Sequence, residues 1–131
     1  MIRIVSTGDG SESDLSGSPH ELSEIARRIA DWIASEAAQL EIAADTECDP
    51  APYDLTLARF VLHRSSGPIR LAVDSGALVA RGSAEAFAHF APWFEFPPDT
   101  PTGNHVQFDN VCGDDYIHDS TIPLVISCAA V

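Results

Sequence analysis

Residues 83–96 read SAEAFAHFAPWFEF, and this stretch predicts a helix with one apolar side. Ser83 can accept a hydrogen bond from the free amides of a first helical turn. Large apolar residues then recur at helical spacing from Phe87 to Phe94. Pro92 removes a backbone donor inside this pattern, so we expect the helix to kink or loosen there.

Two strands are expected after this helix. Residues 97–103 contain three prolines and end in a glycine, which rules out a continued helix and indicates an extended crossing. Residues 105–109 alternate between polar and apolar side chains, as a half-buried strand does. Residues 122–128 form an apolar closing strand, and Pro123 suits an edge position or the first residues of a strand because it cannot donate to a neighbouring strand.

The C-terminal half thus carries a Trp/Phe-rich helix, a strand with His and Asp, a Tyr and an Ile-Pro-Leu-Val-Ile strand, in this order. The residues in this pattern are Trp93, Phe94, Gly103, His105, Phe108, Asp109, Tyr116, Asp119, Ser120 and 123–126. The pattern resembles the immunity protein 32 family of bacterial polymorphic toxin systems. That family often has a second His or aromatic residue where this chain has Gln107, which argues against an inherited metal or catalytic role. The resemblance implies a small cytosolic antidote that binds a cognate toxin domain and is not an enzyme.

The charge of the chain is strongly negative. The 131 residues carry a net charge of −13, which repels phosphate backbones and argues against nucleic-acid binding. All seven basic residues are Arg, and none follows Arg81, whereas residues 82–131 hold seven carboxylates. A basic protein partner would be attracted to such a surface, although solubility alone is a competing explanation of the acidic composition.

Other signals narrow the class of protein. The first ten residues lack the layout of a signal peptide, and no apolar run has the length of a membrane span, so a cytoplasmic protein without membrane contact is expected. Three cysteines without CxxC spacing argue against a disulfide framework or a zinc knuckle. Residues 8–10 (Gly-Asp-Gly) lack the third glycine of a phosphate-binding loop, which argues against a nucleotide site. We therefore predict no cofactor.

The N-terminal half predicts a strand, a linker and a helix. Residues 1–5 suit a short strand, and residues 6–17 are rich in Gly, Ser and Asp, a composition that buries too little apolar surface to order itself. Ser18 begins the helix, because Pro19 suits the first helical position and Glu21 can reach back to the amide of Ser18. The apolar stripe of this helix is Leu22, Ile25, Ala26, Ile29 and Ile33, with Trp32 at its margin.

Between the helices, a meander of strands is expected at residues 39–43, 55–64, 69–73 and 77–81. Matching residues in the two halves are Gly17-Ser18 with Gly82-Ser83, Trp32 with Trp93, Cys48 with Cys112, and Tyr53 with Tyr116. We therefore predict one α+β domain over residues 1–131, with an internal repeat of 1–66 and 67–131. It would hold an antiparallel sheet of about six to eight strands with two helices on one face, built from a duplicated strand-helix-strand-strand unit.

The predicted function is binding of a basic toxin domain, as a monomer or homodimer. The predicted partner-binding residues are His105, Gln107, Asp109, Asp114, Asp115, Tyr116 and Asp119. The alternative is a metal-binding domain or metal-dependent hydrolase that uses His105, Asp109 and His118, since imidazole and carboxylate suit divalent ions. A Cys112 nucleophile beside His118 is conceivable, but the sequence shows neither an orienting third group nor an oxyanion hole. In a third reading, residues 122–128 form an edge strand that pairs two copies.

Overall fold

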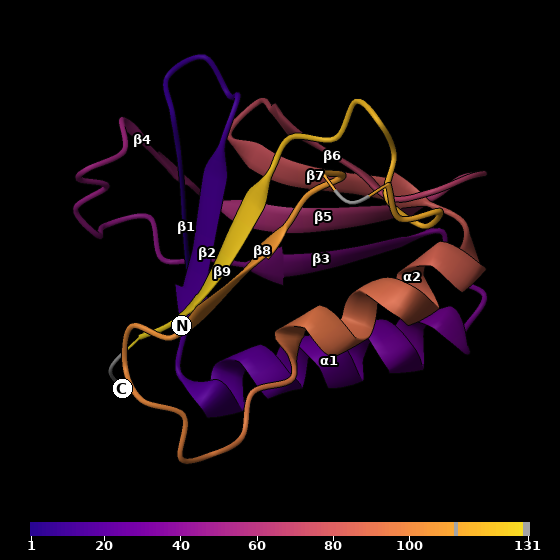
Figure 1. Cartoon of the computed structure of the whole chain (residues 1–131), viewed down its shortest axis with the longest axis horizontal. Coiled ribbons are helices and arrows are strands. Elements are labelled where there is room, and N and C mark those ends of the chain that lie inside the picture. Colours follow the sequence, from indigo (N-terminus) through magenta and orange to yellow (C-terminus); the bar gives the residue numbers. More distant parts are fainter. Residues whose placement is uncertain (112, 130–131) are drawn as a thin grey trace.

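The computed structural model describes residues 1–111 and 113–129, and their strands form two sheets. The five-stranded sheet has the order β4 (Leu55–Leu57), β1 (Arg3–Ser6), β2 (Ser13–Gly17), β9 (Leu124–Cys128) and β8 (His105–Phe108). The four-stranded sheet has the order β3 (Gln39–Ala43), β5 (Arg59–Arg64), β7 (Ala77–Gly82) and β6 (Arg70–Asp74). The strands of the two sheets cross steeply, and both helices lie together along one side of the molecule (Figure 1).

The predicted α+β class is confirmed, but the predicted single antiparallel sheet is wrong. The described residues form nine strands in two sheets, and the pairs β2 with β9 and β5 with β7 are parallel. One reason is the segment expected as a single strand over 55–64, which changes sheet at Ala58. The Ala58 amide donates to Gly76 O, and its carbonyl accepts from the Ala44 amide, so β4 and β5 belong to different sheets.

The linker expected over residues 6–17 is also different in the structure. Its second part is β2, which lies between β1 and β9. Ser13 and Leu15 are fully buried, because β2 is the central strand of the five-stranded sheet. Its first part is a tight turn, in which hydrogen bonds from Ser11 and Thr7 lower the pKa of Asp9 to about 2.

The helices begin where the sequence predicts. Helix α1 (Pro19–Ile33) starts with a complete capping box: Ser18 Oγ accepts from the Glu21 amide at 3.1 Å, and the Ser18 amide donates to Glu21 Oε1 at 3.0 Å. Helix α2 (Ala84–Phe90) is capped by Ser83 and continues as the 3-10 turn η1 (Ala91–Phe94). The helix changes type next to Pro92, as its missing donor leads us to expect.

Both sheets are assembled in the same way from opposite halves of the chain. The hairpin β1–β2 pairs with β9 and β8, and the hairpin β6–β7 pairs with β5 and β3. The Ala129 amide donates to Gly17 O, and the Ser65 amide donates to Gly82 O, both at 2.8 Å. The order strand-strand-helix-strand-strand occurs in both halves, one strand more than predicted, and the first half has β4 in addition, between β3 and β5. The match of Cys48 with Cys112 lies outside the described residues.

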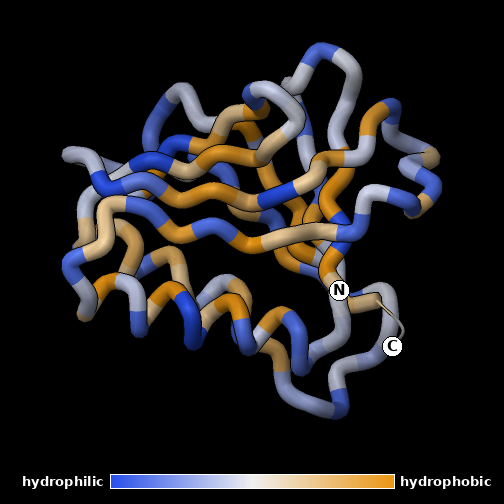
Figure 2. Tube along the Cα trace, turned by 180° about the vertical axis from the view of Figure 1, so that it is seen from behind, coloured by the Kyte–Doolittle hydropathy of each residue, from blue (hydrophilic) through white to orange (hydrophobic). Residues whose placement is uncertain are grey.

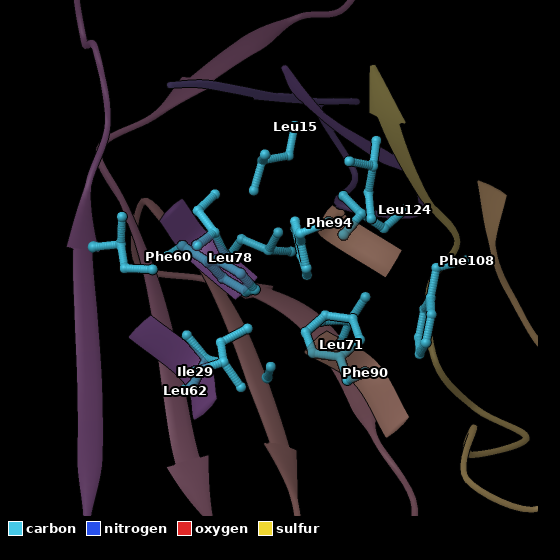
Figure 3. Packing of buried hydrophobic residues seen from close by; sticks show 14 of the residues in the cluster. Leu15, Ile29, Phe60, Leu62, Leu71, Leu78, Phe90, Phe94, Phe108 and Leu124 are labelled. Carbon is cyan, nitrogen blue, oxygen red and sulfur yellow. The ribbon is translucent and has the colours of Figure 1, made fainter. Parts of the chain in front are cut away.

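The core lies between the two sheets and the helices. Apolar side chains from both sheets meet the aromatic residues of α2 and η1 (Figure 3). Phe90 contacts Phe60, Phe94 and Phe108 with ring centroids 6.3, 5.1 and 4.9 Å away, so one ring links both sheets. The most hydrophobic segments lie along the strands, and the loops are mostly hydrophilic (Figure 2).

The closing strand is not an edge. β9 lies between β2 and β8, so the reading in which it pairs two copies as an edge strand is wrong. Pro123 precedes β9, where its missing donor costs the ladder nothing. Among the described residues, no helix has both the length and the apolar character needed to span a membrane.

Candidate partner-binding surface

The side of the five-stranded sheet that faces away from the core is open. Side chains alternate along its strands, so every second residue of β1, β2, β9 and β8 points outward. Strand register brings these residues together in two rows. We define the outer face by Arg3, Ser16, Ser127 and His105 in one row and Val5, Asp14, Val125 and Gln107 in the other.

Asp14 stands near the middle of this outer face. Ser127 Oγ donates to its carboxylate oxygens at 3.2 and 3.3 Å. Partial burial raises the pKa of Asp14, and the Ser127 hydrogen bond and nearby His105 only partly offset this effect. A half-buried carboxylate in the centre of a sheet would gain most from a cationic partner, because that partner would compensate its lost hydration.

Glu12 and Tyr53 lie close to Asp14, beyond the end of β2. The Tyr53 hydroxyl donates to Glu12 Oε1 at 3.3 Å, which ties the loop before β4 to the turn before β2. Burial, together with the carboxylates of Glu12 and Asp14, raises the pKa of Tyr53. The sequence prediction missed Glu12, Asp14 and Tyr53. The only sequence signal for a strand here was the alternation in Ser-Asp-Leu-Ser-Gly at residues 13–17. This signal is weak, because Leu15 is its single large apolar residue.

The predicted residues on β8 lie at the edge of the outer face. His105 and Gln107 are exposed, and Gln107 Nε2 donates to Asp109 Oδ2 at 2.7 Å. The ring nitrogen Nδ1 of His105 lies 3.2 Å from Gly103 O. Asp119 belongs to the same end, because its Oδ1 accepts from Asn110 Nδ2 at 2.7 Å.

The other predicted residues lie at α2 instead. Tyr116 stacks on His89 with ring centroids 3.7 Å apart, and its hydroxyl donates to Glu85 at 3.2 Å, which raises its pKa. Asp114 accepts from the Tyr116 amide at 2.7 Å, and Asp115 is its exposed neighbour. The predicted set therefore divides into two groups, at β8 and at α2.

The structure does not assemble the alternative metal site. His105 and Asp109 lie at opposite ends of β8, about 13 Å apart for four residues of extended chain. His118 is engaged locally, since its Nδ1 accepts from the Ser120 amide at 3.0 Å. Within residues 1–111 and 113–129, no three His, Cys, Asp or Glu side chains are grouped to hold a metal ion. The suggested nucleophile Cys112 lies outside the described residues.

Few of the carboxylates are neutralised by cations. Ion pairs in the described chain join Met1 N to Glu21, Arg27 to Glu24 and Asp31, and Arg59 to Glu41. Within that same part of the chain, no carboxylate of the outer face or of the β8–β9 loop has an Arg or His nitrogen within 4.0 Å. Their negative charge is therefore available to a partner.

A groove runs beside β8 on the side opposite the outer face. Its volume is about 900 Å³, and it lies between η1, the proline-rich crossing and β8. Trp93, Phe96 and Val106 give it an apolar surface, and Glu95 and Asp99 add carboxylates. The edge strand β8 thus lies between the polar outer face and a largely apolar groove.

In comparisons with known proteins, no family model, no curated protein and no solved structure matches this chain.

Proposed function

We propose that this chain is an immunity protein that binds and neutralises a basic toxin domain in the cytoplasm. The observation that carries the proposal is the set of carboxylates formed by Asp14 on the outer face and by Asp109, Asp114, Asp115 and Asp119 between β8 and β9, which have no cationic partner among the described residues. A net charge of −13 would steer a basic protein toward the chain and speed association. The C-terminal resemblance described above points to the same class of protein.

Two tyrosines supply the apolar component of such an interface. Tyr53 and Tyr116 are half-buried, and each hydroxyl is held by a glutamate, Glu12 and Glu85 respectively. An aromatic side chain that is already fixed loses little conformational entropy when a partner covers it. The tyrosines would therefore anchor the complex, while the carboxylates set its orientation and rate.

The partner we favour is a nuclease domain. A nuclease binds its substrate in a cleft lined by Lys and Arg, and a surface of carboxylates can occupy that cleft in place of phosphates. The proposed mechanism is occlusion, which needs no catalytic residue and no cofactor in the immunity protein. The chain would act as a one-to-one complex with the toxin domain.

The first test is co-expression with the candidate toxin domain encoded beside the gene, with cell survival and co-purification as readouts. Replacing Asp114, Asp115 and Asp119 by Ser should weaken the complex by at least tenfold and reduce its salt dependence. The matched control replaces Asp31, Glu36 and Asp74 by Ser, which removes the same charge away from the proposed surface.

Equal affinity of the two triple variants would contradict the proposed surface. Absence of both rescue and a complex for the unmodified chain would contradict the function itself. Circular dichroism of each variant would verify that it is folded.

A further inference from the structure

The edge of β8 offers free backbone groups. The Cys128 amide donates to Asn104 O, on the side of β8, and the Ala129 amide donates to Gly17 O, on the side of β2. Backbone groups of successive residues in β9 therefore point alternately toward β8 and toward β2. By the same alternation, Val106 and Phe108 bond to β9, and His105 and Gln107 direct their N–H and C=O groups away from the sheet. Within the described residues, these outward groups have no hydrogen-bond partner.

Other sheet edges are covered to different extents. The segment before β9 covers β6, because the Ile69 amide donates to Tyr116 O and the Ile122 amide donates to Leu71 O. At β3, Arg28 Nη2 donates to Glu41 O at 3.2 Å, while the outward amide of Gln39 has no partner among the described residues. β4 is only three residues long. β8 is the edge that combines free backbone groups with an adjoining groove, so it is the edge on which we expect a further strand to form a ladder.

A strand added to β8 would contact two different surfaces. Its side chains would alternate between the outer face, beside Gln107 and Asp109, and the groove lined by Trp93 and Phe96. On the side of the outer face, Asp109 supplies a carboxylate next to His105 and Gln107. On the other side, the groove is largely apolar, with Glu95 and Asp99 among its lining residues. The complementary strand therefore has cations on the side of the outer face and apolar side chains on the side of the groove.

We propose that the basic partner docks by adding an extended strand, with alternating cationic and apolar side chains, to the edge of β8. This inference rests on the proposed function and specifies how the toxin domain binds. Backbone hydrogen bonds to His105 and Gln107 hold the strand, and the groove and outer face select its side chains. A second copy of this chain is a poor occupant, because the groove and the end of β8 at Asp109 hold carboxylates and no Arg or Lys, so like charges would meet.

The first experiment uses a seven-residue peptide, acetylated and amidated, in which Arg and Val alternate. If the peptide adds in the antiparallel direction, the peptide residues whose backbone bonds to β8 lie directly opposite His105 and Gln107. Their side chains point to the same side of the sheet as those of His105 and Gln107, where the arginines are expected. N-methylation of the Arg amides should weaken binding at least tenfold, whereas N-methylation of the Val amides should change it less than about threefold.

Parallel addition would reverse the roles of the two methylated peptides and would also support strand docking. Isothermal titration gives the affinities, and NMR should show the largest amide shifts at His105 and Gln107. Two methylated peptides that bind as well as the parent would overturn the proposal, because charge alone would then explain binding.

The second experiment uses the toxin domain and two proline variants. Gln107→Pro removes an outward N–H without breaking the ladder to β9, and it should weaken the complex at least tenfold. The control Gln39→Pro, at the start of β3, changes an outward amide on the other sheet and should have less than about a threefold effect.

These outcomes separate the two proposals. If wild type and Gln107→Pro bind the toxin domain equally, strand docking fails and the immunity function stands. If the wild type neither binds nor neutralises the toxin, the function fails, and the peptide measurements decide the docking mode alone. A dimer that sedimentation detects and Gln107→Pro abolishes would overturn the assignment of the partner, because a second copy would then occupy the edge.

Discussion

The two halves of the molecule connect each helix to the following strand in different ways. Residues 34–38 join α1 to β3, and residues 95–104 join η1 to β8. The shorter connection is clamped by Arg64, whose Nη2 donates to Trp32 O at 2.6 Å and Ile33 O at 3.1 Å. Its guanidinium carbon also lies 5.0 Å from the centre of the Trp32 ring.

The longer connection has no such clamp at the equivalent position. Cys128 occupies the position that corresponds to Arg64. The Arg64 amide donates to Ala38 O, just before β3, and the Cys128 amide donates to Asn104 O, just before β8. The Sγ of Cys128 lies only 3.7 Å from Thr100 O, a weak contact. Pro97 and Pro101 of this connection line the groove together with His105 and Val106 of β8. One connection is thus clamped by Arg64, and the other borders a groove.

Among the variants that test this difference between the two connections, Arg64→Ala should change the free energy of unfolding most. It removes the hydrogen bonds to the end of α1, together with those to Ser35 O and Ala37 O at 2.9 Å each. We expect a loss of about 2 to 3 kcal/mol in the free energy of unfolding. Arg59→Ala is the control from the same strand, where an exposed pair with Glu41 contributes less than about 1 kcal/mol. Urea unfolding measures both, and equal losses would show that Arg64 is not a clamp.

The two glycines before the helix caps should differ in their tolerance of a side chain. A Cβ at Gly82 would lie 2.7 Å from Cδ1 and 3.3 Å from Cα of Ile69, which is buried and cannot move aside. A Cβ at Gly17 would lie 3.2 Å from Cγ2 of Ile2. We expect Gly82→Ala to cost about 2 kcal/mol and Gly17→Ala less than about 1 kcal/mol. Thermal unfolding would detect the difference, and the reverse order would contradict it.

The helix caps offer a smaller contrast. Ser18 takes part in a reciprocal capping box, whereas the Ser83 side chain only accepts from the Ala86 amide at 3.1 Å. Ser18→Ala should therefore cost about 1 to 2 kcal/mol and Ser83→Ala about 0.5 to 1 kcal/mol. Chemical denaturation of both variants tests this order. A larger loss for Ser83→Ala would mean that α2 depends on its cap more than α1 does.

Asp14 should give the smallest effect, and its sign depends on pH. Burial raises the pKa of Asp14 above its ordinary value of 3.8, so the folded chain holds this proton more tightly than the unfolded chain. Stability therefore decreases as pH rises from about 3.8 through the folded pKa. Asp14→Asn should raise the melting temperature at pH 7 and lose this advantage at low pH.

Ser127→Ala is the matched variant for this measurement. It removes the hydrogen bond that favours the Asp14 carboxylate, so it should lower stability more at pH 7 than at low pH. A melting temperature of Asp14→Asn that follows the wild type at every pH would contradict the proposed burial cost.

The sequence predicted local features better than contacts between residues that are distant in the chain. The cap at Ser18 and the change of helix type at Pro92 depend on residues within one turn, and both predictions were correct. The switch between sheets at Ala58 depends on partners on distant strands, and the sequence contains no local signal for it. The division of the predicted acidic set has the same cause, because contacts with His89 and Glu85 place Tyr116 at α2.

The sequence by itself determined the α+β class, both helix starts, the excess of negative charge and most of the apolar stripe of α1, in which the structure buries Trp32 and leaves Ile33 only partly buried. Each follows from residue type, spacing or composition, and none requires knowledge of distant contacts. Only the tertiary structure decided that β2 is a central strand, that Asp14 and His105 share one face, and that β8 is an open edge. Strand pairing joins residues that are far apart in the chain, so the candidate surface forms only when β2 of one half pairs with β9 of the other.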